Sequence, residues 1–213
     1  IFQTLQPEFI ITDESNTSNI QKILDNLGEM IGIVIPNSKE NNIFCSTDDD
    51  VPMPVEQDDM AIFLSSGTTD NSKFVVLSHK TFNTSALLAY ENYRFSLEDR
   101  LLMALPLPHM FGGNCLLGGG LIGRTTLIIE SSFKVSSILE QIIEQDITIF
   151  AGVPTQFYYM THFMKSTRSG RPNRYFKYAI SGGNILSEEL AQSFYQLFGV
   201  QISNLYGCTE VGF

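Results

Sequence analysis

Short runs of β-branched and aromatic residues alternate along this chain with longer segments in which apolar residues recur every three or four positions. The short runs are typical of buried strands, and the longer segments are typical of amphipathic helices. Beyond residue 100 the pattern predicts strands over 101–105, 125–130, 147–150, 176–180 and 201–203, and helices over 109–121, 136–145, 155–164 and 187–198. Strands and helices that alternate so regularly form a parallel sheet covered by helices on both faces.

The N-terminal part of the chain carries the same alternation. Residues 8–12 and 31–35 are predicted strands on either side of an amphipathic helix over 18–30. This order is a βαβ unit, which again implies a parallel sheet. We therefore expect an α/β fold with two lobes, residues 1–96 and residues 97–213, each built from a parallel sheet covered by helices.

The polar segment SSGTTDNSK, Ser65 to Lys73, interrupts two apolar strands predicted over 60–64 and 74–78, and a helix over 80–93 follows. Because a strand follows the loop, this is a hairpin and not the strand–loop–helix of a Walker motif. Its backbone N–H groups, hydroxyls and ammonium can converge on phosphate oxygens. The candidate phosphate-binding residues are Ser65, Ser66, Gly67, Thr68, Thr69 and Lys73. A solvated polar turn is the alternative interpretation.

A second candidate site lies in the C-terminal segment. Gly182 and Gly183 follow a predicted strand, and glycines there let the backbone approach a planar ligand closely. The helix over 187–198 has Ser187 as its predicted N-cap and Gly199 as its stop. The next strand ends in a polar and aromatic cluster, namely Asn204, Tyr206, Gly207, Thr209 and Glu210. Open α/β sheets bind ligands at such strand ends.

Five segments between Ala61 and Glu210 resemble, in order, the motifs of the adenylate-forming superfamily. This superfamily includes acyl- and aryl-CoA synthetases, luciferases and the amino-acid-activating domains of nonribosomal peptide synthetases. SSGTTDNSK resembles TSGTTGxPKG, LPLPHMFG over 105–112 resembles PLFHxxG, GVPT resembles the start of the VPT helix, SGGNIL resembles SGGAPL, and YGCTE resembles YGxTE. The resemblance implies ATP-dependent activation of a carboxylic acid to an acyl-adenylate, followed by transfer to the thiol of CoA or of carrier-protein phosphopantetheine.

The resemblance also implies residue roles. Glu210 is expected to ligate Mg²⁺, Thr209 to donate to the α-phosphate, and Tyr206 to lie against adenine. Gly182, Gly183 and Asn184 are expected to line the adenine edge, and the loop from Ser65 to Lys73 is expected to hold the β- and γ-phosphates. Asn204 and Gly207 are further expected nucleotide-binding residues. His109 is expected between the carboxylate pocket and the α-phosphate, and a buried histidine packed at a helix start is the alternative.

Departures from the family pattern leave other functions open. Asp70, Ser72 and Phe74 stand where the family has Gly, Pro and Gly, so a nucleotide-binding module without turnover is one alternative. NLYGCTE resembles the amino-acid-activating members, whereas PLPHMFGG lacks the acid that those members use to hold an amino group. A non-amino acid is favoured because a buried substrate ammonium needs a counter-charge. A scaffolding α/β domain is a third alternative.

Composition narrows the partners to small molecules or a carrier protein. The net charge of −10 argues against nucleic acid binding. Three widely spaced cysteines favour reduced thiols in a cytoplasmic protein, and no apolar run is long enough to span a membrane. The acid-rich stretch over 48–59 predicts a solvated loop, with a metal site as the alternative. The family's third lobe and C-terminal lid are not among these motifs, so we expect this chain alone to be inactive.

One further pattern, Gly118, Gly120 and Gly123, has the spacing of a dinucleotide-binding motif. It follows a predicted helix and precedes a strand, which is the reverse of the order that such a site needs. We therefore expect these glycines to serve close helix packing.

Overall fold

The computed structural model describes residues 9–11, 18, 22, 32–34, 55–65, 73–167 and 175–212. Contacts divide the chain into two compact units, Ile1–Met53 and Pro54–Phe213. In the first unit, β1 (Phe9–Ile11) and β2 (Gly32–Val34) pair in parallel, which confirms the strand pairing of the predicted βαβ unit. Of the helix predicted between them, only Ser18 and Lys22 fall within the described residues, and both are helical and exposed. The predicted lobe boundary at residue 96 stays a prediction.

The second unit is built on a five-stranded parallel sheet with the order β6-β5-β7-β8-β9. The strands are β5 (Arg100–Met103), β6 (Thr126–Ile129), β7 (Ile149–Gly152), β8 (Tyr178–Ser181) and β9 (Ile202–Asn204). The helices are α3 (His79–Tyr93), the π-helix η1 (Phe111–Gly118), α4 (Gly119–Ile122), α5 (Val135–Glu144), α6 (Pro154–Thr167), α7 (Glu188–Phe198) and the short 3-10 turn η2 (Thr209–Val211). The α/β fold with a helix-covered parallel sheet is thus confirmed.

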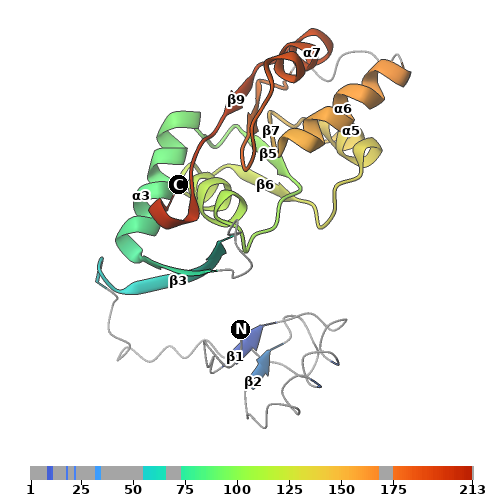
Figure 1. Cartoon of the computed structure of the whole chain (residues 1–213). Coiled ribbons are helices and arrows are strands. Elements are labelled where there is room, and N and C mark those ends of the chain that lie inside the picture. Colours follow the sequence, from blue (N-terminus) through green and yellow to red (C-terminus); the bar gives the residue numbers. More distant parts are fainter. Residues whose placement is uncertain are drawn as a thin grey trace. The chain divides into compact units, whose positions relative to one another are not determined.

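Helices cover both faces of this sheet (Figure 1). Leu101 and Met103 of β5 belong to a buried cluster shared with α3 and η1, while Leu102 belongs to a cluster shared with α5, α6 and α7. Neighbouring residues of a strand point to opposite faces, so an apolar run buries side chains in both layers. Each buried Leu or Phe contributes about 1.5–3 kcal/mol.

The ends of α7 follow the sequence signals. The Ser187 hydroxyl accepts a hydrogen bond from the Leu190 backbone N–H at 3.2 Å, and Gly199 ends the helix with a left-handed φ of +75°. Both predictions are confirmed. These caps delimit α7, which connects the turn after β8 to β9.

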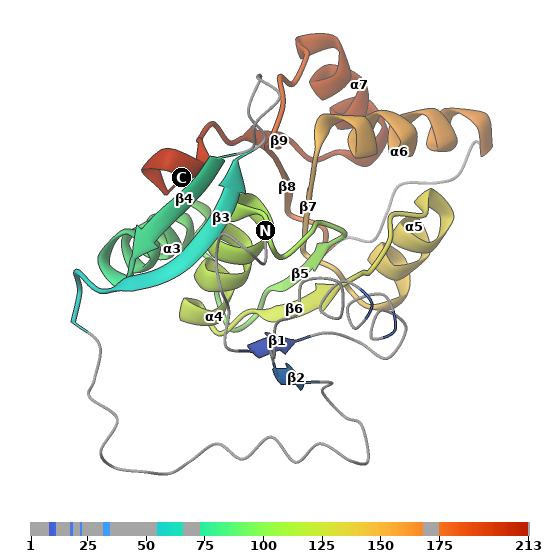
Figure 2. The same cartoon turned by 60° about the horizontal axis from the view of Figure 1, so that its bottom comes forward.

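A two-stranded antiparallel hairpin, β3 (Asp59–Ser65) and β4 (Lys73–Ser78), lies beside α3 (Figure 2). Ser65 pairs with Lys73 at the last position of the ladder. One face of the hairpin packs Phe63 and Leu77 against Met110. The hairpin interpretation of the phosphate loop is therefore confirmed, whereas the intervening residues 66–72 lie outside the described part of the chain.

The helix predicted over 109–121 is present in a modified form, because its first eight residues adopt the wider π geometry and only the last four are α-helical. Gly112 and Gly113 lie so close to the preceding loop that an added Cβ would lie 2.6 Å from the Pro106 oxygen and 2.1 Å from the Leu107 oxygen. Hydrophobic periodicity does not distinguish π from α helices, so the sequence analysis missed this feature.

Of the glycines with dinucleotide-like spacing, Gly118 serves close helix packing, as expected, whereas Gly120 faces strand β6. A Cβ added at Gly118 would lie 2.9 Å from the Ala86 Cβ of α3, and one at Gly120 would lie 2.7 Å from Leu127 Cδ2. Only a missing side chain allows α3 and the η1–α4 segment to approach so closely.

Candidate functional site

The predicted ligand-binding segments follow the carboxyl ends of neighbouring parallel strands. The segment 105–109 follows β5, Val153 follows β7, Gly182–Asn184 follows β8, and 205–210 follows β9. Backbone hydrogen bonds join these segments, since Leu205 N–H donates to the Ser181 oxygen at 2.7 Å and Gly182 N–H donates to the Gly152 oxygen at 3.2 Å. The carboxyl edge of an open parallel sheet is where such folds bind ligands.

Gly182 and Gly183 have different structural roles in this edge. Gly182 is buried, and a Cβ there would lie 3.1 Å from both Leu205 Cδ2 and the Phe111 ring. Gly183 is exposed and has a φ of +78°, so it makes the turn after β8. Asn184 is exposed as well, and its side-chain oxygen accepts from the Ile185 N–H at 2.8 Å.

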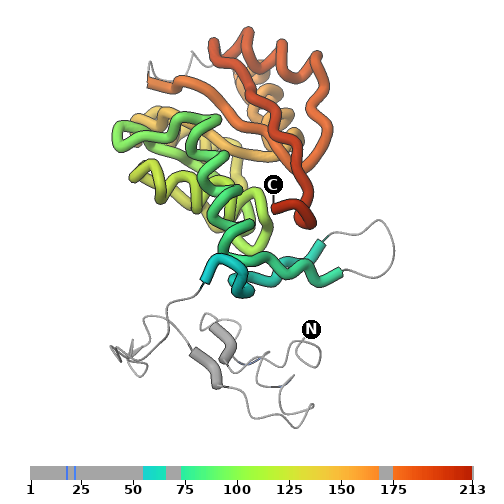
Figure 3. The backbone as a smooth tube through the Cα atoms, turned by 90° about the vertical axis from the view of Figure 1, so that its left-hand side faces the viewer, coloured from blue at the N-terminus to red at the C-terminus, as the bar shows by residue number. Residues whose placement is uncertain are grey.

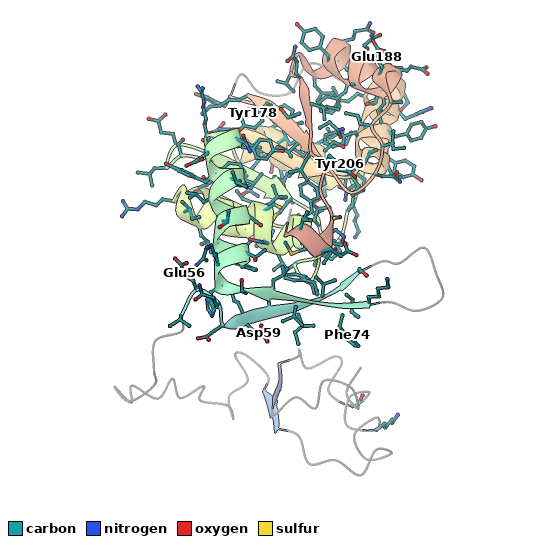
Figure 4. The ribbon with its side chains drawn as sticks, turned by 60° about the vertical axis from the view of Figure 1, so that its left-hand side comes forward. Glu56, Asp59, Phe74, Tyr178, Glu188 and Tyr206 are labelled. Atoms are coloured by element: carbon teal, nitrogen blue, oxygen red, sulfur yellow. The ribbon has the colours of Figure 1, made fainter. Side chains whose placement is uncertain are left out.

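Two large side chains on neighbouring segments of this edge project into solvent. Tyr206 is 92% exposed and Ile185 is 88% exposed. Figure 4 shows Tyr206 on the segment that runs from β9 toward η2. Asn204 and Gly207 on either side of Tyr206 are exposed too. An aromatic ring this open can accept a planar ligand without rearrangement, and Ile185 is a neighbour that the sequence analysis did not identify.

The η2 turn holds Thr209 and Glu210 beside the hairpin. It packs against β3, and Gly212, with a φ of +82°, lies so close to α3 that a Cβ would be 2.6 Å from Thr81 Cγ2. Figure 3 shows the C-terminal turn near the hairpin and α3. The YGCTE segment is therefore next to the strand that leads into the phosphate loop, although some 140 residues separate Glu210 from Ser65 in the sequence.

The described ends of the phosphate loop have unsatisfied hydrogen-bonding capacity. Ser65 is 7% exposed, and its hydroxyl has no hydrogen-bond partner in the described part of the chain. Lys73 is exposed and makes no ion pair with a described residue. Buried polar groups without partners are uncommon, and a ligand is one way to satisfy them. Ser66, Gly67, Thr68 and Thr69 lie outside the described residues.

The carboxylate of Glu210 is exposed, and among the described residues it has no salt-bridge partner. The described ranges contain no group of three or more His, Cys, Asp or Glu side chains that could hold a metal ion by themselves. Mg²⁺ is usually bound by one or two carboxylates together with water and substrate phosphates. One open carboxylate, on a turn that contacts the strand leading into the phosphate loop, fits such an ion.

His109 is exposed, which shows that the alternative of a buried, packed histidine is wrong. Its Nδ1 accepts a hydrogen bond from the Phe111 backbone N–H at 3.2 Å, and the His109 backbone N–H donates to the Pro106 oxygen at 3.2 Å. With Nδ1 used as an acceptor, the neutral ring carries its proton on Nε2, which has no hydrogen-bond partner among the described residues and can donate to a ligand.

Two buried polar side chains at this edge were not identified from the sequence. Ser181 is fully buried at the end of β8, and its hydroxyl has no described partner. Gln156 is buried at the start of α6 and bonds to two backbone segments. The only sequence signal was their position, directly at or after a buried strand.

The opposite, amino edge of the sheet carries a separate polar network. The buried Asp99 carboxylate accepts hydrogen bonds from Lys177, Thr148 and Ser96. Burial by itself raises the pKa of Asp99, but the hydrogen bonds from these three residues and the Lys177 charge outweigh it and hold the pKa below its usual value. A cavity of about 710 Å³ adjoins this network, with Arg94, Tyr178 and Gln201 in its lining. The four motif segments that follow β5, β7, β8 and β9 lie at the other edge.

Comparison with known proteins decides the family. The family model described as AMP-binding enzyme matches residues 1–213. The chain belongs to the AMP-binding enzyme family. This membership confirms the resemblance drawn from the five motifs. Within the described ranges of this AMP-binding chain, no helix is both long and apolar enough to cross a membrane.

Among its relatives, 4-coumarate–CoA ligase-like 2 of Arabidopsis thaliana is 31% identical over 162 residues, which are 75% of this chain and 28% of that protein. 4-coumarate–CoA ligase-like 6 of the same plant is 31% identical over 214 residues, covering 92% of this chain and 38% of that protein. The chain thus spans about a third of the length of these relatives. The structure of ATP-bound MatB from Rhodopseudomonas palustris matches with a TM-score of 0.80 at 24% identity, over 98% of this chain and 42% of MatB. At that identity the likeness establishes the fold.

Proposed function

We propose that the protein carrying this chain activates a non-amino carboxylic acid as its acyl-adenylate, with ATP as the second substrate, and transfers the acyl group to a thiol. The observation that supports this most is the convergence of the segments after β5, β8 and β9 at one edge, with η2 placed beside β3 of the phosphate hairpin. A carboxylate must attack the α-phosphorus of ATP, so two anions have to be brought together and neutralised.

Each candidate residue has one proposed role in this reaction. Lys73 and the donors of its loop hold the β- and γ-phosphates, and Thr209 donates its hydroxyl to the α-phosphate. Glu210 holds a bound Mg²⁺, which supplies charge neutralisation of the phosphates. Tyr206 offers its open ring to the adenine. His109 donates from Nε2 at the junction between the acid and the α-phosphate.

CoA is the favoured acceptor, with carrier-protein phosphopantetheine as the other thiol of this class. Support comes from the names of the relatives, which are CoA ligases. A non-amino acid is favoured because residues 105–113, which follow β5, contain no acidic side chain to balance a substrate ammonium. A cytoplasmic location stays a prediction.

A nucleotide-binding module without turnover is the second candidate. It is favoured by Asp70 and Ser72, which stand where the family has Gly and Pro and lie outside the described residues, and by Phe74. Phe74 is half-buried in β4 opposite Leu64, so it belongs to the strand and does not act as a loop hinge. A stiffer loop releases pyrophosphate more slowly, which would leave binding intact and reduce turnover.

The test is acid-dependent exchange of pyrophosphate into ATP by the complete protein. Aromatic, aliphatic, dicarboxylic and amino acids are compared, and CoA and a phosphopantetheinylated carrier protein are then offered as acceptors. We expect exchange with one class of non-amino acid and thioester formation with CoA. Exchange with amino acids alone would support an amino-acid-activating domain. ATP binding without exchange would support the module, and no ATP binding would support a scaffold.

A further inference from the structure

Gln156 is a buried amide that bridges the carboxyl ends of two neighbouring strands. It lies in the first turn of α6 and is 8% exposed. Its Nε2 donates to the Ala104 backbone oxygen, just after β5, at 2.9 Å. Its Oε1 accepts from the Val153 backbone N–H, just after β7, at 3.0 Å. A buried amide is costly unless both ends are paired, and here both ends are.

The two backbone groups that Gln156 holds belong to different parts of the candidate site. Ala104 begins the segment that leads to His109. The backbone N–H of His109 donates to the Pro106 backbone oxygen in that segment. Val153 lies against the turn after β8, where its Cγ1 would be 3.6 Å from a Cβ at Gly183. One side chain therefore connects the segment proposed to face the acid with the turn proposed to face the adenine.

The Gln156 amide is closely packed against Gly152 of β7. A Cβ at Gly152 would lie 2.4 Å from Gln156 Oε1 and 3.0 Å from the Phe150 ring. A side chain at position 152 would therefore displace the Gln156 amide from its present position. The position of the Gln156 side chain is thus fixed by packing as well as by its two hydrogen bonds.

We propose that Gln156 is a positioning residue that sets the spacing between the His109 segment and the Gly182–Gly183 turn, and so aligns the substrate carboxylate with the α-phosphorus. This inference rests on the proposed function. Gln156 acts through the backbones of Ala104 and Val153. Reacting atoms must lie about 3–3.5 Å apart, and a misplacement of about 1 Å can cost on the order of 10²-fold in rate.

The two arms of the amide can be tested separately in the complete protein. Gln156→Glu keeps the side-chain volume and an oxygen acceptor for Val153 N–H. Its protonated form can still donate to the Ala104 oxygen and its ionised form cannot, so this variant is assayed across a pH series, and the expected loss is that of the ionised form. Gln156→Met has a similar volume and keeps neither bond. The matched controls are Gln192→Glu and Gln192→Met, because Gln192 is exposed on α7 and its amide bonds to Glu188 of the same helix.

The readout is the kcat of pyrophosphate exchange and the separate KM values for acid and ATP, with thermal unfolding measured alongside. We expect Gln156→Glu to lower kcat by about 10- to 100-fold and to raise the KM for the acid, with the KM for ATP within about twofold of wild type. Gln156→Met should also raise the KM for ATP, because it loses the Val153 arm. The Gln192 variants should match wild type.

Three results would overturn the inference. Folded Gln156 variants with wild-type kinetics but a lower Tm would show a purely structural role. Equal rises in both KM values for Gln156→Glu would show that the two arms are not separable. Failure of this isosteric variant to fold would show that the amide serves the fold. A wild-type protein without exchange for any acid would instead refute the proposed function, and the inference with it.

Discussion

Asp99→Asn is the substitution whose effect on stability the structure defines best. The Asp99 carboxylate is 3% exposed and accepts from Lys177 Nζ at 2.8 Å, Thr148 Oγ1 at 3.0 Å, Ser96 Oγ at 2.6 Å and Ser96 N–H at 3.1 Å. These donors come from the residues that precede β5, β7 and β8. The carboxylate therefore fastens the amino ends of three neighbouring strands.

The expected loss in the free energy of unfolding follows from the single acceptor oxygen of an amide. Asparagine has one acceptor oxygen, so its NH₂ group must face either Lys177 or the Ser96 N–H. The two hydroxyls can rotate to accept, but the Ser96 N–H cannot. An unsatisfied buried donor costs about 1–3 kcal/mol. Because Lys177 is 48% exposed, the loss of its ion pair adds only about 0–1 kcal/mol. We expect a total loss of about 2–4 kcal/mol in the free energy of unfolding.

The assay is urea unfolding followed by circular dichroism between pH 7 and pH 3. The hydrogen bonds from Lys177, Ser96 and Thr148 hold the folded pKa of Asp99 below its unfolded value, which is about 3.9. The stabilisation is therefore fully present above the unfolded pKa and is lost as the pH falls through the folded pKa. The difference between wild type and Asp99→Asn should shrink below about pH 4.

Asp146→Asn is the matched control. Asp146 is exposed in the turn before β7 and has a φ of +49°, a conformation that Asn tolerates well. This variant should stay within about 0.5 kcal/mol of wild type at every pH. If Asp99→Asn is as stable as wild type, or if its deficit is the same at pH 3 and pH 7, the carboxylate does not hold the strands as argued.

Three further predictions concern the candidate site and its turn. Glu210→Gln should remove most Mg²⁺-dependent pyrophosphate exchange, whereas Glu189→Gln, an exposed control on α7, should not. A titration of the exchange rate against Mg²⁺ concentration distinguishes the two variants. Tyr206→Ala should weaken ATP binding by about 1–2 kcal/mol and Tyr206→Phe by much less; equal losses in a nucleotide titration would assign the effect to the hydroxyl. Gly183→Ala should cost about 1–2 kcal/mol of stability because φ is +78°, whereas Gly183→Asn should cost less, and urea unfolding would contradict this if the two variants were equal.

Local patterns in the sequence were enough to predict the order of strands and helices in the second unit and its parallel sheet. Ser187 and Gly199 marked both ends of α7, because capping depends only on residues within one helical turn. The strand-turn-strand pattern around Ser65 and Lys73 identified the hairpin for the same local reason. Alternation of strands and helices then implied that the motif segments would meet at one edge of the sheet.

The long-range hydrogen bonds that join those segments became visible only in the tertiary structure. The amide of Gln156 reaches Ala104, 52 residues away, and Lys177 reaches Asp99, 78 residues away. Neither pairing produces a periodic pattern in the sequence. Each depends on which distant groups the packing of the fold brings next to the buried side chain. The π form of η1 and the exposure of His109 likewise left no signal in the sequence pattern. Such features arise from the shapes of surfaces that meet only after the chain has folded.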